Sequence, residues 1–223
     1  MTLYESLLVD LNTYSESSYA EFHKKLLGEG DFRVLGVRVP TLRKLAKKYY
    51  PNYEEVKNFP NDYYEVKFIK LSISALLPYE RFIKEVETCV ALIDNWALCD
   101  CFSAKCIGKN REDFLNYVQK FFTDGREFYQ RYALTTLLQF YVEEQYLNVI
   151  FDYVERADTD YYYVHMAAAW LIAEVLVKHY EKGVEFLKNT KIDKKTVNKA
   201  ISKACESFRI SDDKKNYLRG LKR

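Results

Sequence analysis

Apolar residues three or four positions apart recur along this chain of 223 residues, and no alternating apolar–polar stretch outweighs them. This spacing places apolar side chains on one face of a helix. With 7 Gly and 4 Pro, the chain also lacks the turn residues that sandwiches and barrels of many strands need. The sequence therefore predicts an all-α fold. The clearest stripes are Leu3-Leu7-Leu8-Leu11, Phe114-Val118-Phe121-Phe122 and Tyr132-Leu134-Leu137-Leu138-Tyr141.

Helix breakers and capping residues divide this pattern into about thirteen helices of roughly 8–20 residues with short loops. The breakers are Ser15–Ser18, Gly28–Gly30, Pro40, Pro51, Pro60, Pro78, Asp124-Gly125 and Asp158–Asp160. Asp94 or Asn95 is expected to cap a helix that starts at Trp96, and Asn110 to cap the next one. Ser211 is expected to open the last helix.

No long linker rich in Pro, Gly or Ser separates these helices, so residues 1–223 are expected to form a single domain. Helix pairs spaced by roughly 35–45 residues favour a solenoid of the HEAT or armadillo kind, with about six antiparallel pairs. A compact orthogonal bundle is the alternative. In a solenoid the second helix of each pair builds the concave face, where we expect the function.

Charge and cysteine content limit the partners and the cell compartment. The net charge is only +2, but residues 188–223 hold 12 Lys and Arg against 4 Asp and Glu, which fits either a polyanion contact or a solvated helix face. Five cysteines without an export signal indicate reduced thiols and a cytoplasmic protein. Cys99, Cys101 and Cys106 lack a CxxC pair and a nearby His, so we expect no metal site.

The longest run without a charged residue, 161–173, is too short to span a bilayer, so no membrane partner is expected. Nucleotide-binding, zinc-protease and serine-hydrolase motifs are absent, and none of the three His has a convincing Ser or Cys partner. Catalysis would therefore depend on carboxylate, aromatic and guanidinium groups.

Three segments carry such groups. Trp96 and Asp100 are four residues apart, so on a helix they share a face that bounds a small pocket, unless Trp96 is a core residue. Arg131 stands among apolar residues, where it either joins a buried ion pair or reaches a phosphate. Trp170 follows three alanines that permit close helix packing, and core packing is again the alternative.

The order of these motifs resembles the AlkD-like DNA alkylation repair proteins, which are DNA glycosylases built from HEAT-like repeats. The resemblance covers roughly residues 1–210. Spacings of 31 residues from Asp100 to Arg131 and 39 from Arg131 to Trp170 add specificity. The matching pieces are Leu35-Gly36-Val37-Arg38-Val39-Pro40-Thr41-Leu42-Arg43, Asn95-Trp96-x-x-x-Asp100, Gln130-Arg131-x-Ala133 and Ala167-x-x-Trp170.

The resemblance implies a monomeric solenoid that wraps duplex DNA and hydrolyses the N-glycosidic bond of cationic N3- or N7-alkylated purines. It implies no cofactor, no metal and no lyase step. Asp100 would be the catalytic carboxylate, Trp96 and Trp170 would flank the sugar-phosphate, and Arg131 would support the backbone contact or brace the site. Arg38 matches a DNA-contacting position where the family commonly has a polar amide.

The second-helix aromatic that faces DNA in the family has no clear counterpart near Leu26-Leu27-Gly28. Further candidates for phosphate contacts are Lys105, Lys109, Lys199 and Lys203. The alternative function is a non-catalytic HEAT-like module that binds nucleic acid or a protein through the same face.

Overall fold

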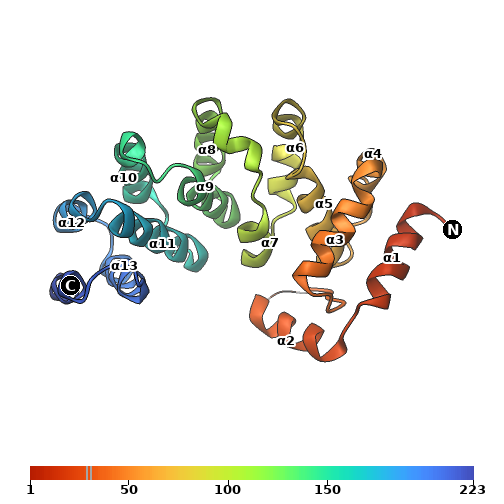
Figure 1. Ribbon diagram of the computed structural model, residues 1–223, viewed down its shortest axis with the longest axis horizontal. Helices are drawn as coiled ribbons and strands as arrows, with labels where there is room; N and C mark the ends of the chain where they lie inside the picture. The colour runs from red at the N-terminus through yellow and green to blue at the C-terminus, as the bar shows by residue number, and fades with distance from the viewer. Residues whose placement is uncertain (29, 31) are drawn as a thin grey trace. The chain divides into compact units, whose positions relative to one another are not determined.

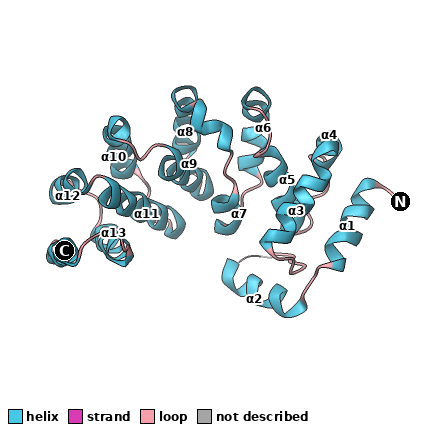
Figure 2. Cartoon of the chain, in the orientation of Figure 1, coloured by secondary structure: helices cyan, strands magenta, loops and turns pink. Residues whose placement is uncertain are grey.

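The computed structural model describes every residue except 29 and 31, and in this part of the chain it shows helices and no strand (Figures 1 and 2). The predicted all-α fold is therefore confirmed. The chain divides into two compact units, residues 1–109 and 110–223. We describe each unit by itself. Among the described residues, no helix has the length and apolar character needed to cross a membrane.

Unit 1 holds seven α-helices and two short 3₁₀ helices within its described residues. Their bounds are α1 (Leu3–Thr13), α2 (Ser17–Leu27), α3 (Val39–Tyr49), η1 (Tyr50–Asn52), α4 (Tyr53–Val56), α5 (Tyr64–Ser74), α6 (Tyr79–Ala91), α7 (Trp96–Cys101) and η2 (Lys105–Lys109). Helix α5 is the centre of the unit, since α3, α4, α6 and α7 all pack against it. Nearly every residue of α5 is buried, including the charged Glu65 and Lys70.

Unit 2 repeats one arrangement along its length. Its elements are α8 (Arg111–Asp124), α9 (Glu127–Phe140), η3 (Glu144–Tyr146), α10 (Leu147–Arg156), α11 (Tyr162–Lys178), α12 (Tyr180–Asn189), α13 (Lys194–Glu206) and α14 (Asp212–Gly220). Helices α9, α11 and α13 pack side by side in one row, and α8, α10, α12 and α14 accompany them (Figure 1). This alternation is compatible with the predicted solenoid of two-helix repeats.

Helix α11 is the core of unit 2 because it is apolar on nearly every side. A helix of this kind is stable only when neighbours cover it all round. Ala167, Ala168 and Ala169 are completely buried, and their small side chains allow α9 and α13 to approach closely. A narrow stripe along α11 keeps contact with solvent, and it consists of Tyr163, Met166, Trp170, Glu174 and Val177.

Local signals fixed most helix ends as predicted. Pro40 lies in the first turn of α3, and Gly125 ends α8 with a positive φ of 86°. Asn95 rather than Asp94 caps α7, since its side chain accepts from the N–H of Leu98 at 3.0 Å. Helix α2 starts after Glu16, inside the predicted Ser15–Ser18 break. The middle residue of the Gly28–Gly30 breaker lies outside the described residues.

Two helices are shorter than the predicted 8–20 residues: α4 has 4 residues and α7 has 6. Helix α7 ends early because Phe102 leaves the helical conformation and its buried ring packs 5.9 Å from that of Phe82. The short helix matters, since it carries Trp96 and Asp100. The expectation of a single domain over residues 1–223 stays a prediction.

Candidate functional site

The loop before α3 is folded around a buried carboxylate. Glu65 on α5 is completely buried, and its side chain accepts hydrogen bonds from the N–H groups of Leu35 (3.0 Å), Gly36 (2.8 Å) and Val37 (3.3 Å). Burial raises the pKa of Glu65, and these donors oppose that rise. The motif Leu35-Gly36-Val37 is thus the backbone cradle of this carboxylate.

Gly36 is required in this cradle. Its φ is +86°, and a Cβ atom there would lie 2.3 Å from the backbone oxygen of Glu16. The carbonyl of Gly36 accepts from the N–H of Glu16 at 3.1 Å, so the loop also positions the start of α2. The loop Leu35-Gly36-Val37 therefore joins α2, α3 and α5.

Arg38 follows the cradle at the N-cap of α3 and is exposed. Its Nε and Nη2 atoms bind the Glu16 carboxylate at 2.7 and 2.8 Å, and its guanidinium carbon lies 4.7 Å from the ring centroid of Tyr19. Arg38 lowers the pKa of Glu16. Its third nitrogen, Nη1, has no hydrogen-bond acceptor among the described residues.

Helix α7 places Trp96 and Asp100 one turn apart on its partly exposed side, while Ala97, Leu98 and Cys99 face the core. Trp96 is half-buried, and its indole Nε1–H donates to the carbonyl oxygen of Leu26 at 3.1 Å. This bond satisfies a carbonyl in the last turn of α2, which has no partner within the helix. The indole is therefore fixed by its own polar atom, and Asp100 beside it keeps contact with solvent.

The end of α2 also presents an aromatic side chain. Phe22 is 58% exposed and Leu26, four residues later, is 47% exposed, so both lie on one outward face of α2. An exposed aromatic side chain thus lies on α2, one turn before the segment Leu26-Leu27-Gly28, which contains no aromatic residue. The signal was present in the sequence: an i, i+4 pair of large apolar residues in a helix of otherwise polar character.

Arg131 on α9 is almost completely buried, with 2% of its surface exposed. Its Nη1 atom donates to the carbonyl oxygen of Tyr163 at 2.7 Å, and Glu127, one turn earlier, accepts from the N–H of Tyr163 at 2.9 Å. Gln130 accepts from the N–H of Asp158 at 3.0 Å. The motif Gln130-Arg131 therefore anchors the N-terminal end of α11 and the loop before it.

Trp170 lies in the middle of the solvent-contacting stripe of α11 and is half-buried. The guanidinium carbon of Arg131 lies 5.6 Å from the ring centroid of Trp170 and 5.7 Å from that of Tyr163. These distances fit cation–π contacts. Arg131 thus supports Trp170 from the core side of the helix.

The structure pairs the candidate residues within units: Trp96 with Asp100 on α7, and Arg131 with Trp170 across α9 and α11. Arg38, in unit 1, contacts Glu16 and Tyr19. Sequence reasoning missed Glu65, Glu127 and Phe22. Among the described residues, no three His, Cys, Asp or Glu side chains gather as a metal site requires.

Comparison with known sequences gives one family. The sequence model described as "DNA alkylation repair enzyme" matches residues 10–208, which is most of the chain and extends over both units. No curated protein matches the chain.

Proposed function

The chain belongs to the family of DNA alkylation repair enzymes, and we propose that it is a monofunctional DNA glycosylase. The proposed reaction is hydrolysis of the N-glycosidic bond of cationic N3- or N7-alkylated purines in duplex DNA. The observation that carries this proposal is a solvent-accessible carboxylate, Asp100, one helical turn from the hydrogen-bonded indole of Trp96. A binding scaffold has no need of this pair.

The proposed chemistry starts from the charge of the damaged base. Alkylation makes the purine cationic, so it leaves with the electrons of the C1′–N bond as a neutral base. The sugar then develops oxocarbenium character, and the Asp100 carboxylate stabilises that positive charge. Asp100 also takes the proton of the water that attacks C1′, which completes the hydrolysis.

The two tryptophans are proposed to flank the sugar-phosphate of the damaged nucleotide. Indole faces are electron-rich and attract a developing cation. They also exclude water, which strengthens the interaction with the carboxylate. For Arg131, the 2% exposure favours bracing of Trp170 over a direct DNA contact.

Two further residues are proposed to contact DNA. Arg38 has Nη1 available for a phosphate oxygen while Glu16 holds its other side. Phe22, exposed on α2, is proposed as the counterpart of the second-helix aromatic of the family. Both lie in unit 1, the unit of Asp100.

The test is release of free base. Full-length protein is incubated with duplex DNA that carries N3-methyladenine and N7-methylguanine, and with the same duplex unmethylated. We expect release of the methylated bases only, and an intact abasic strand because the enzyme has no lyase step. Binding of the methylated duplex without any base release would refute the proposal and support the alternative of a non-catalytic binding module.

A further inference from the structure

Unit 1 contains a cavity of about 750 Å³ that the proposed glycosylase chemistry does not use. Its volume lies within the usual range of roughly 300–1,000 Å³ for small-molecule sites. It is bounded by α3, the end of α5 and the segment after Asp100. The lining residues are Arg43, Ala46, Lys47, Ser72, Ala75, Leu76, Leu77, Pro78, Cys101, Ser103, Lys105 and Cys106.

The charged groups of this cavity all carry the same sign. Arg43 and Lys47 lie one turn apart on α3, and Lys105 reaches the cavity from η2. No carboxylate belongs to the lining, and among the described residues no carboxylate oxygen lies within 4 Å of any of these three cations. The next lysine on α3, Lys48, instead forms an ion pair with Asp10 at 2.5 Å. The lining thus carries three cations and no carboxylate.

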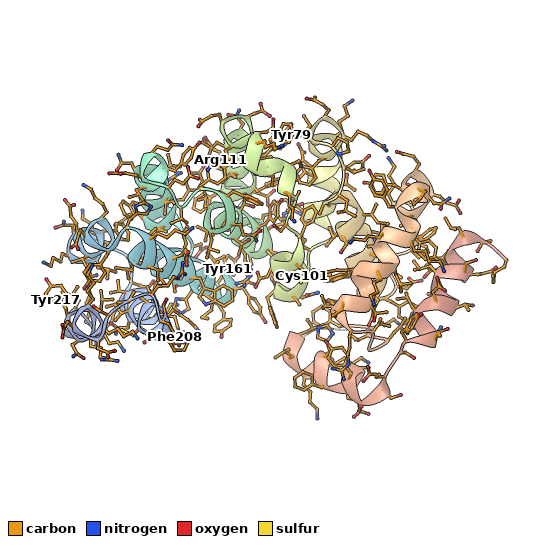
Figure 3. The ribbon with its side chains drawn as sticks, in the orientation of Figure 1. Tyr79, Cys101, Arg111, Tyr161, Phe208 and Tyr217 are labelled. Carbon is orange, nitrogen blue, oxygen red and sulfur yellow. The ribbon has the colours of Figure 1, made fainter. Side chains whose placement is uncertain are left out.

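The remaining polar groups of the lining do not reduce this charge. Burial raises the pKa of the Cys101 and Cys106 thiols, so at neutral pH both are uncharged. Cys101 ends α7 and is marked in Figure 3. The hydroxyl groups of Ser72 and Ser103 are neutral hydrogen-bonding groups, which can donate to an anion.

Part of the lining is apolar, and we call this part the apolar floor. It consists of Ala46, Ala75, Leu76, Leu77 and Pro78, and Leu76 is 49% exposed. Burying an apolar surface of this kind under a flat ring is favourable by about 25 cal/mol per Å². A ligand that fills the cavity therefore needs an anionic group for the cations and an apolar, planar body for the floor.

We propose that this cavity is a nucleotide-binding site, with the phosphate held by Arg43, Lys47 and Lys105 and the base lying on the apolar floor. The Arg43 guanidinium presents a planar fork that fits two phosphate oxygens, and the lysines act as point charges. The same chemistry comes from two sources: a free nucleotide, or an unpaired nucleotide of a DNA strand. This site is distinct from Asp100, which is not part of the lining.

The experiment is isothermal titration of the full-length protein with four probes: AMP, dTMP, inorganic phosphate and an oligothymidylate of eight nucleotides. Saturable binding of AMP and dTMP indicates a free nucleotide as the ligand. Binding of the oligonucleotide alone indicates a DNA strand. Both results support the proposal, and neither requires base release, so a failed glycosylase assay does not affect them.

Three variants test whether the ligand occupies the cavity. The double variant Arg43→Gln/Lys47→Gln is expected to weaken binding by about tenfold or more, since each charge-assisted hydrogen bond contributes roughly this factor. The matched control Lys44→Gln/Lys48→Gln removes two charges from the same helix outside the lining, and we expect less than about a threefold change. Ala75→Leu keeps all charges, fills the floor and is expected to weaken nucleotide binding while leaving phosphate binding unchanged.

Several results would overturn the proposal. One is the absence of saturable binding for all four probes. Another is an equal loss in the two double variants, which would indicate non-specific attraction to a basic helix. Inorganic phosphate binding as tightly as AMP and dTMP would show that the apolar floor takes no part. Thermal melting of each variant checks that a loss of binding does not come from unfolding. We expect the melting temperature of the cation variants to change little, because the substituted cations are exposed.

Discussion

Trp96 and Trp170 are held in different ways. Trp96 in unit 1 lies on a helix of 6 residues and is fixed by its own N–H, which donates to Leu26. Trp170 in unit 2 lies on a helix of 17 residues, in contact with the buried guanidinium of Arg131. Its indole N–H has no hydrogen-bond acceptor among the described residues.

The two units therefore position their candidate residues by different kinds of contact. In unit 1, polar contacts between distant segments position a short helix that keeps Asp100 accessible to solvent. In unit 2, Trp170 lies on a helix packed through completely buried alanines and is in contact with the buried guanidinium of Arg131. We therefore expect variants in unit 1 to change the site through lost hydrogen bonds, and variants in unit 2 to change it through packing and the buried charge.

The largest effect is expected for Glu65→Ala in unit 1. Three backbone N–H groups, those of the buried Gly36 and Val37 and the part-buried Leu35, lose their acceptor, and each such loss costs roughly 1–3 kcal/mol for a buried group. We expect the free energy of unfolding of unit 1 to fall by about 3–5 kcal/mol, with faster hydrogen exchange in residues 1–109 than in residues 110–223. Glu65→Gln keeps one acceptor oxygen and should lose less. Equal acceleration of exchange in both units would contradict the claim that the hydrogen bonds to Glu65 stabilise unit 1 specifically.

Arg131→Met is expected to have the next largest effect, in unit 2. The substitution leaves the carbonyl of Tyr163 without its 2.7 Å donor and removes the cation beside Trp170. We expect a loss of about 2–3 kcal/mol, seen as faster exchange at the start of α11. The matched variant Arg126→Met, at an exposed arginine before α9, should change exchange there little. If Arg131→Met exchanged at the wild-type rate at the start of α11, Arg131 would not brace this segment.

Acid is expected to act more strongly on unit 1. Burial lowers the pKa of both His23 and His165, so each folded unit binds fewer protons than the unfolded chain, and stability falls as the pH drops below about 6.5. His165 has Thr196 at 2.8 Å, and the nearby Asp193 favours its charged form, while Lys195 and Lys199 disfavour it. The Nδ1 atom of His23 is buried with no partner among the described residues.

Hydrogen exchange at about pH 7 and pH 5 measures how much protection each unit loses on acidification. His23→Phe keeps a ring against Tyr64, which lies 4.6 Å from the imidazole, and it removes the titrating group. We expect the variant to lose less protection in unit 1 on acidification than the wild type. An unchanged loss in unit 1 would mean that another group carries the pH dependence.

The smallest effects are expected for two conservative changes, Trp96→Phe and Trp170→Phe. The first removes the donor to Leu26, so we expect a loss of about 1 kcal/mol in the free energy of unfolding. Trp170→Phe removes no hydrogen bond that the described residues make, so we expect a smaller loss in the free energy of unfolding. Thermal melting of both variants gives the comparison, and equal losses would show that the indole N–H of Trp96 contributes nothing.

Helix boundaries were predictable where the signal is local. Asn95, Pro40 and Gly125 act through the backbone of their own turn, so their positions in the sequence were sufficient to place the ends of α7, α3 and α8. The length of α7 was not predictable, because it depends on where Phe102 is buried.

The contacts that position the site join residues far apart in the chain. Glu65 lies 30 residues from Leu35, and Trp96 lies 70 residues from Leu26. For Arg131 the sequence left an ion pair and a phosphate contact open and gave no sign that one acceptor is the carbonyl of Tyr163, 32 residues away. Backbone N–H and carbonyl groups leave no trace in side-chain patterns, so periodicity and spacing could not identify these partners.

Single-turnover release of N7-methylguanine from methylated duplex DNA, compared between wild type and Asp100→Asn, tests the central claim most directly. Asp62→Asn serves as the control, since it removes the same charge from an exposed side chain of unit 1 that accepts a hydrogen bond from Tyr4. We predict that Asp100→Asn keeps the fold and lowers the rate by about 10²–10³, the usual effect of removing one electrostatic group at a reacting centre. Equal rates for Asp100→Asn and the wild type would contradict the assignment of Asp100 as the catalytic carboxylate.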